Sequence, residues 1–336
     1  MALAGFGETP VDDGHAPPAD QLASCYACRV LLGALQASDV MKLARFRPVR
    51  AVAVLCLLPL AGCSMQSLTA FYTAGAVGAD ERGLIAITAV LMLFVFIPVV
   101  SLTLFFAWRY RESNAEARYS PKWSHSNLLE VFLWGGPIVI IAILGTLTWI
   151  STHRLDPYNS LASENQDPVQ VEAIAMDWKW LFVYPQYNVA AVNELAMPVN
   201  TPISLHLTSD TVMTAIMIPR MGSQIYAMSG MRTQLHLLPT QTGDFMGKNY
   251  QYNGRGFASE RFHARSMTDE QFKSWIKKAK ASGQRLDEAR YAELTKPSQP
   301  EGVTYFSPVK PHLLNYVIKQ YHTGSPRNRI TRTAER

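Results

Sequence analysis

Two long uncharged apolar runs constrain this chain more than any other feature of its sequence. Residues 84–108 form a run of about 25 residues without a charge, and residues 131–150 form a second run of about 20. A helix of about 20 apolar residues is long enough to cross the hydrocarbon core of a bilayer. Pro98 is compatible with such a helix, because neighbouring groups can satisfy the carbonyl that it frees. The sequence therefore predicts a hairpin of two transmembrane helices.

The loop between the two runs, residues 109–130, sets the orientation of the predicted hairpin. It contains the cations Arg109, Arg111, Arg118 and Lys122. Because short loops rich in lysine and arginine remain in the cytoplasm, we expect this loop to be cytoplasmic. Both ends of the mature chain are then expected on the periplasmic side of a bacterial inner membrane.

Residues 41–62 have the pattern of an export signal that ends at Cys63. A basic start precedes the apolar residues 51–60, a run too short to span a bilayer. Residues 60–63 read Leu-Ala-Gly-Cys and resemble the lipobox of bacterial lipoproteins. The resemblance implies that Cys63 carries a diacylglycerol and becomes the new N-terminus. Residues 63–83 would then be an exported segment; a chance Ala-Gly-Cys after an apolar run is the alternative.

Residues 1–40 precede this signal, and we interpret them as an upstream over-extension of the reading frame. They contain Cys25 and Cys28, a lone C-x-x-C pair that is a weak indicator of metal or redox chemistry. The remaining cysteine besides Cys63 is Cys56, inside the signal. The mature protein is therefore expected to contain no free thiol and no disulfide.

Residues 169–267 change to the alternating pattern of β-strands. Ile203, Leu205 and Leu207 alternate with polar residues, and aromatic residues occupy every second position from Trp178 to Tyr184. Turn sequences rich in Gly, Pro and Asn separate the short strands. The pattern predicts a sandwich or barrel of about a hundred residues.

Residues 268–321 are predicted to form a short helical region, followed by a basic tail at 322–336. Thr268 and Gln271 have the spacing of a capping box. Apolar residues then recur at helical spacing, and we expect them to pack against the sandwich. The net charge of +5 is modest and much of it lies in the tail. A nucleic-acid partner is not expected, because no basic stripe is predicted on a folded face.

A lipobox, a helix hairpin and an exported β domain together resemble subunit II of the haem–copper oxidases, in the bo-type quinol-oxidase branch. Residues 176–180, Met-Asp-Trp-Lys-Trp, match the aromatic strand that opens the cupredoxin-like domain of this family. Residues 218–231 and 119–127 resemble the quinol-oxidase branch. The resemblance implies an α+β membrane protein: a two-helix transmembrane hairpin, a cupredoxin-like sandwich or barrel, and a short C-terminal helical region.

The copper-binding branch of this family carries a histidine five residues before a proline, followed by C-x-x-x-C-x-x-x-H-x-x-M. In this chain Thr214 stands five residues before Pro219. The second motif aligns with Tyr252, Gly254, Gly256, Glu260 and His263. A dinuclear copper centre needs the soft thiolates of two cysteines, and none is present here. We therefore expect a cupredoxin-like domain without copper ligands and no metal in this chain.

The histidines of the β region offer little alternative to these ligands. His206, His236 and His263 alternate with apolar neighbours and are predicted to point away from the sandwich core. Histidines on a surface are more often solvated than bound to a metal. No metal site is expected at them.

The resemblance also implies a function for the chain as part of an enzyme. A haem-bearing subunit I would hold the haems and copper, reduce oxygen to water and pump protons. Electrons would reach it directly from ubiquinol, with this chain as a membrane-lipid-anchored structural and assembly subunit among other oxidase subunits. Glu130 matches a glutamate implicated at the mouth of a proton-uptake channel; the alternative is a helix cap formed with Asn127.

Two other classes of function remain open at this point. One is a cytochrome c oxidase subunit II with dinuclear copper, which the absence of the two cysteines disfavours. The other is a non-enzymatic membrane lipoprotein with a β-sandwich, which the two predicted spanning helices and the match at residues 218–231 disfavour.

Overall fold

The computed structural model describes residues 71–114, 116, 120, 122–162, 166–299 and 302–323. The predicted N-terminal extension, the export signal, Cys63 and residues 324–336 of the basic tail lie outside the described residues.

Two helices are long and apolar enough to cross a membrane, as predicted: α4 (Ala76–Arg109) and α5 (Asn127–Arg154). Their apolar stretches contain no buried residue within the described chain. An ion pair joins Arg154 near the end of α5 to Asp80 near the start of α4, at 3.4 Å. The two helices are therefore antiparallel, with the 109–126 connection at the opposite end.

The helix α4 begins well before the predicted start of the apolar run at residue 84. Its first two turns contain Asp80, Glu81 and Arg82, which belong to the segment 63–83 placed before the apolar run. In the structure Glu81 accepts a hydrogen bond from the backbone N–H of Ser223 at 3.0 Å. The early turns are thus stabilised by the β domain and not by lipid, which the apolar pattern could not reveal.

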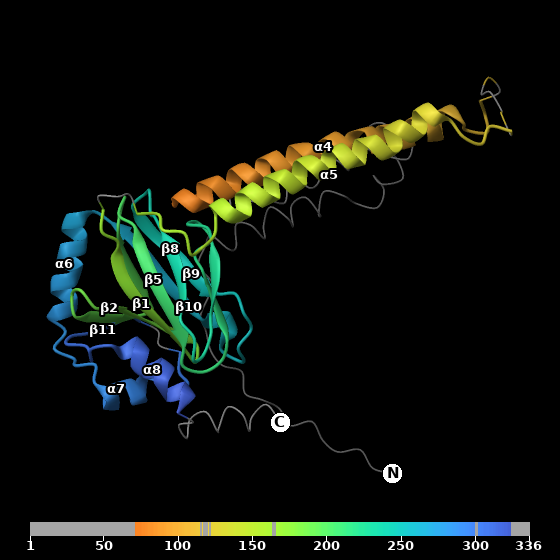
Figure 1. Ribbon diagram of the computed structural model, residues 1–336. Coiled ribbons are helices and arrows are strands. Elements are labelled where there is room, and N and C mark those ends of the chain that lie inside the picture. Colours follow the sequence, from red (N-terminus) through yellow and green to blue (C-terminus); the bar gives the residue numbers. More distant parts are fainter. Residues whose placement is uncertain are drawn as a thin grey trace, which may run out of the picture. The chain divides into compact units, whose positions relative to one another are not determined.

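The β domain consists of two sheets that face each other (Figure 1). The six-stranded sheet has the order β11-β3-β2-β1-β5-β8, and the five-stranded sheet has the order β4-β10-β9-β6-β7. The strands are β1 (Val169–Met176), β2 (Lys179–Tyr184), β3 (Val189–Val192), β4 (Glu194–Pro198), β5 (Ile203–Ser209), β6 (Thr214–Met217), β7 (Gln224–Ala227), β8 (Thr233–Leu237), β9 (Gly243–Asn249), β10 (Arg261–Met267) and β11 (Thr304–Phe306). This two-sheet sandwich agrees with the predicted fold class.

The aromatic residues of β2 form the centre of the core between the sheets. Trp180, Phe182 and Tyr184 are fully buried, and Phe262 of β10 packs against the first two with ring centroids 6.0 and 5.0 Å away. Alternate positions of a strand point to the same face, which is why every second residue joins this core. The period-2 pattern of residues 180–184 is confirmed.

A second core covers the other face of the six-stranded sheet. Leu181, Val183 and Ile174 point to this face and pack with Tyr291 and Phe306 from the C-terminal region. Strands β2 and β3 and the second half of β1 are therefore buried on both faces, which explains their nearly continuous apolar sequence. Strand β11 lies inside the region predicted as helical and pairs with β3.

Three helices flank the sandwich: α6 (Asp269–Lys280), α7 (Glu288–Leu294) and α8 (Leu313–His322), with α7 and α8 together at one end of it (Figure 1). The predicted capping box of Thr268 and Gln271 is confirmed at the start of α6. The apolar face of α6, with Phe272 and Trp275, joins the core between the sheets, the inner core. Leu313 of α8 joins the second core on the other face of the six-stranded sheet, the outer core. Packing of the two apolar faces against the sandwich is therefore also confirmed.

Backbone hydrogen bonds connect the start of α4 directly to the β domain. The N–H groups of Ala74 and Gly78 donate to the carbonyls of Arg220 and Met221, at 2.6 and 2.9 Å. Gly222 has a φ of +80°, and a Cβ there would lie 2.6 Å from the backbone N of Gly78. This turn belongs to residues 218–231. The segment that resembles the quinol-oxidase branch therefore forms the surface against which the start of α4 packs.

Candidate functional site

Two of the positions aligned with copper ligands lie close together on one side of the sandwich. Thr214 is the first residue of β6, and Glu260 follows the short 3₁₀ helix η2 (Phe257–Ser259); both are fully buried. Asn249 at the end of β9 joins them. Its Oδ1 accepts a hydrogen bond from the backbone N–H of Ala215 at 3.0 Å, and its Nδ2 donates to Glu260 Oε2 at 3.0 Å. The fold therefore brings these positions together.

Glu260 is the buried centre of a polar cluster. Asn253 Nδ2 donates a second hydrogen bond to Glu260 Oε2 at 2.6 Å. Burial raises the pKa of Glu260 to about 7, although the two asparagine amides lower it, and the nearby Asp177 raises it further. Desolvation thus outweighs the two hydrogen bonds, and Glu260 changes its charge near neutral pH.

Two buried polar atoms around Glu260 have no hydrogen-bond partner among the described residues. They are Thr214 Oγ1 and Asn253 Oδ1. The indole of Trp180 lies beside the Glu260 carboxylate and contributes to lowering its pKa. The side chains that could face a metal ion here thus offer oxygen atoms and an indole N–H. They include no thiolate, thioether or imidazole. Copper in a dinuclear centre prefers soft sulfur ligands. These residues do not fit the copper centre of the related branch.

Trp178 occupies the space that a side chain at position 256 would need. A Cβ on Gly256 would lie 2.2 Å from ring atoms of Trp178. The indole N–H donates to the carbonyl of Asn253 at 3.3 Å, and Trp178 itself has a φ of +63°. This left-handed conformation is unusual for a bulky residue. It places Trp178 in the turn between β1 and β2, apart from the other aromatic residues of the run, which lie on β2. A cysteine at position 256 could not be accommodated without moving Trp178.

Lys179 connects the same site to the C-terminal region. Its side chain is buried, and its Nζ donates to the carbonyl of Lys296 at 2.8 Å and to the hydroxyl of Ser298. Burial lowers the pKa of Lys179, while Asp177 opposes this effect. The amide of Gln299 lies beside Gly256. The segment after α7 therefore closes the cluster from outside.

The remaining aligned positions do not converge on this cluster. The side chain of Tyr252 is mostly exposed and packs edge-on against Phe257. His263 lies on the exposed side of β10, with Nδ1 3.1 Å from the carboxylate of Asp244. Gly254 has a φ of +109°, which favours glycine at this turn. Within the described residues, no three His, Cys, Asp or Glu side chains are grouped so as to hold a metal ion.

The prediction that His206, His236 and His263 are surface residues needs one correction. All three point away from the inner core, but His236 is only 6% exposed. The chain after α5 covers it, and its backbone N–H donates to the carbonyl of Pro157 at 3.2 Å. Burial lowers the pKa of both His206 and His236. A strand pattern shows which way a side chain points and not what later covers it.

Glu130 lies in the first turn of α5 and is exposed in the described chain. The alternative interpretation as a capping box with Asn127 is wrong. Ser126 is the N-cap residue, Asn127 is already helical, and no side chain caps the helix. The carboxylate of Glu130 is therefore not needed to satisfy the backbone at the start of this helix.

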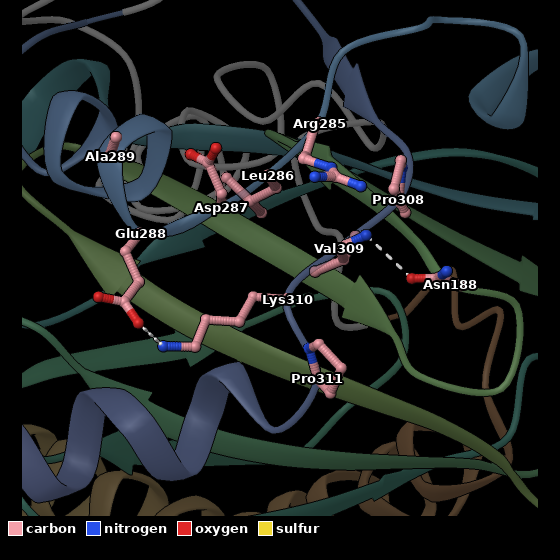
Figure 2. Close-up of a pocket in the computed structure, with 10 residues that line it drawn as sticks. All are labelled: Asn188, Arg285, Leu286, Asp287, Glu288, Ala289, Pro308, Val309, Lys310 and Pro311. Atoms are coloured by element: carbon pink, nitrogen blue, oxygen red, sulfur yellow. Dashed lines mark hydrogen bonds and ion pairs between the residues drawn. The ribbon is translucent and has the colours of Figure 1, made fainter.

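A surface pocket of about 670 Å³ lies elsewhere, between the start of α7 and residues 308–311 (Figure 2). Figure 2 shows Lys310 directed at Glu288, with which it forms an ion pair. Asn188 accepts a hydrogen bond from the backbone N–H of Val309 at 2.9 Å. The main polar groups are thus engaged with one another, and the pocket presents no converging catalytic set.

Comparisons with known proteins agree with this architecture. A family model described as the COX Aromatic Rich Motif matches residues 280–325. Ubiquinol oxidase subunit 2 of Acetobacter aceti is 46% identical over 275 residues, which cover 82% of this chain and 88% of that protein. Cytochrome bo(3) ubiquinol oxidase subunit 2 of Pseudomonas aeruginosa is 48% identical over 268 residues, 80% of each chain.

This chain belongs to the ubiquinol oxidase subunit 2 family. It is accordingly a subunit of a respiratory oxidoreductase complex. A solved structure of the periplasmic domain of cytochrome oxidase subunit II from Bradyrhizobium japonicum is 25% identical, with a TM-score of 0.33. The alignment covers 34% of this chain and 94% of that one.

Several residues of the cluster were not anticipated from the sequence. Asn249 and Asn253 looked like ordinary turn residues, because asparagine is common wherever strands end. Lys179 was part of the aromatic motif, but nothing in a single sequence marks a lysine as buried. The Trp-Lys-Trp spacing at 178–180 and the alignment with the copper motif were the two sequence features that drew attention to this region.

The raised pKa of Glu260 predicts a pH-dependent stability. Taking 4.5 for the unfolded chain and about 7 for the folded one, the folded state binds the proton more tightly. The contribution of protonated Glu260 to the stability of the folded state is complete below pH 4.5 and is lost as the pH rises to about 7. The loss amounts to about 3 kcal/mol. Glu260→Gln keeps the acceptor for the asparagines but cannot ionise, so the variant should be more stable than the wild type at pH 8 and similar to it near pH 4.5.

Thermal unfolding of the detergent-solubilised protein between pH 4.5 and 8.5 measures this difference. Glu293→Gln provides the control, because the side chain of Glu293 is 60% exposed. If the Glu260→Gln and wild-type curves run parallel across this range, Glu260 does not titrate in the cluster as described.

Proposed function

We propose that this chain is the copper-free subunit II of a proton-pumping terminal ubiquinol oxidase. In this role it contains no redox centre and acts as a structural and assembly subunit. A haem-bearing subunit I would hold the haems and copper, take electrons directly from ubiquinol and reduce oxygen to water. The arrangement of Trp178, Gly256 and Glu260 is the main support, because it replaces the copper ligands by a closed polar cluster.

The membrane topology of the proposal follows from the two helices and their flanking charges. Arg109, Arg111 and Lys122 lie at the end of the hairpin opposite to the β domain. With the positive-inside rule, this end is cytoplasmic and the β domain is periplasmic. The helices fit a protein of the bacterial inner membrane. A lipid on Cys63 would anchor the mature N-terminus in the outer leaflet, on the same side of the membrane as the β domain.

Glu130 is proposed to collect protons at the cytoplasmic entrance of an uptake path in subunit I. It lies in the first turn of α5, directly after the basic loop, and its side chain is exposed. A carboxylate at this boundary can take protons from water and pass them inward. Because Glu130 does not cap the helix, its charge is free for this role.

Purification through a tag on this chain tests the assignment of the complex. We expect haem to co-purify and the preparation to oxidise ubiquinol but not reduced cytochrome c. The intact mass of the chain should correspond to a start at Cys63 with the diacylglycerol attached. Efficient oxidation of cytochrome c would favour the copper-containing branch, and absence of haem would favour the lipoprotein without enzymatic function. A chain that retains residues 1–40 would contradict the lipid and the start site.

Glu130→Gln tests the proton-entry proposal. Glutamine has the same shape but cannot ionise, so haem content should stay normal while quinol-oxidase turnover falls by roughly threefold or more. Glu130→Asp should recover part of the rate, because the acid remains on a shorter side chain. Glu112→Gln is the matched control, as Glu112 is an exposed carboxylate of the same loop. Wild-type turnover of Glu130→Gln across the working pH range, or loss of haem from it, would refute the role.

A further inference from the structure

A small pocket of about 180 Å³ lies where the two membrane helices meet the β domain. Both chain segments at the outer end of the hairpin contribute to it: the first turns of α4, and the end of α5 with the residues that follow. Its polar lining comes from Asp80, Arg154, Asp156, Asn159, Ser223 and His236. None of these residues belongs to the Glu260 cluster or to the proposed proton entrance.

Hydrogen bonds hold the chain after α5 in place around this pocket. Asp156 Oδ1 accepts from the backbone N–H of Tyr158 at 2.9 Å, and Asn159 Nδ2 donates to the carbonyl of His153 at 2.8 Å. The carbonyl of Pro157 accepts from His236 on β8. One wall of the pocket is therefore the turn after α5, which is hydrogen-bonded to strand β8.

The charges of the pocket are of both signs, with an excess of negative charge. Asp80 and Asp156 supply two carboxylates, and Arg154 supplies one guanidinium. The Asp80–Arg154 pair is 3.4 Å apart and largely exposed, so its members can also contact a third group. The pocket thus offers a place for a cation beside a place for an anion.

His236 adds an uncharged donor to this set. Its Nε2 lies 2.8 Å from the amide nitrogen of Gln234, which also donates to the hydroxyl of Ser204. With Nε2 accepting that hydrogen bond, the neutral ring carries its proton on Nδ1, which has no partner among the described residues. Because His236 lines the pocket, this N–H is the uncharged donor of the site.

The position of the pocket relative to the apolar helices narrows the class of ligand. The uncharged run of α4 begins at Leu84, one turn after Asp80, and that of α5 ends at Ile150, one turn before Arg154. In a bilayer this level corresponds to the headgroup region, where polar heads sit above apolar chains. A headgroup in the pocket would leave its acyl chains beside the exposed apolar surface of the helices.

We propose that this pocket binds the headgroup of a phospholipid that carries a primary ammonium, phosphatidylethanolamine. Asp80 and Asp156 would accept hydrogen bonds from the ammonium, and Arg154 with His236 would contact the phosphate. A choline headgroup has no N–H to donate, and a phosphatidylglycerol headgroup has no cation to balance the two carboxylates. The proposal depends on the hairpin spanning the membrane but not on the oxidase reaction.

Native mass spectrometry of the complex, purified through this chain and stripped of lipid, tests the proposal. Lipids with identical acyl chains and successively methylated ethanolamine headgroups are added back. Retention should fall with each methyl group, and by about tenfold from the primary ammonium to choline, since each methyl removes a hydrogen-bond donor. Phosphatidylglycerol should be retained no better than choline lipid. Equal retention along the series would show ordinary annular lipid and overturn the proposal.

Two variants locate the binding in this pocket. Asp80→Asn and Arg154→Gln should each weaken retention of phosphatidylethanolamine by about tenfold, because each removes one charged contact. Arg111→Gln is the matched control, an exposed arginine at the other end of the hairpin. Wild-type retention by both pocket variants would place the lipid elsewhere and overturn the proposal. If a pocket variant loses haem and thus its assembly, the headgroup series on the wild-type complex decides alone.

Discussion

The packing of Trp178 on Gly256 determines what the β domain of this chain can hold. The indole takes the volume of a side chain at position 256, and it is fixed by the carbonyl of Asn253. Asn253 in turn donates to Glu260, and Lys179, next to Trp178, holds the C-terminal segment over the same cluster. Asn249 donates to the same oxygen of Glu260, so hydrogen bonds run from Trp178 through Asn253 and Glu260 to Asn249. Aromatic and amide side chains thereby fill the place in the sandwich that aligns with the copper ligands of the related branch.

The junction between hairpin and sandwich is the second element on which the architecture depends. Glycines at positions 78 and 222 let two backbones approach so closely that hydrogen bonds form without intervening side chains. Residues 218–231 therefore have a structural role, because the first turns of α4 pack against them and form hydrogen bonds with their backbone. The covered His236 and the charged pocket arise at the same junction, where the turn after α5 lies against β8.

The sequence predicted the elements that a strong physical requirement dictates. Lipid demands long apolar helices, and the inner core demands the alternating aromatics of β2, so both were visible as patterns. The start of α4 was missed because Asp80 and Glu81 are engaged by Arg154 of α5 and by the β domain, contacts that the apolar pattern does not reveal. The turn at Asp177 and Trp178 was missed because Trp178 itself fits the aromatic alternation of the strand that follows. The cluster around Glu260 was only partly anticipated, since asparagines at strand ends and a buried lysine carry no signal in one sequence.

The copper content of this chain, purified free of other subunits and incubated with copper, is the most direct measure of the account. The donor set around Glu260 predicts no stoichiometric copper and no thiolate-to-copper charge-transfer bands in the visible spectrum. The same measurement on a Trp178→Ala variant should also find none, because opening the space supplies no thiolate. Stoichiometric copper with those bands in the wild-type chain would contradict the account.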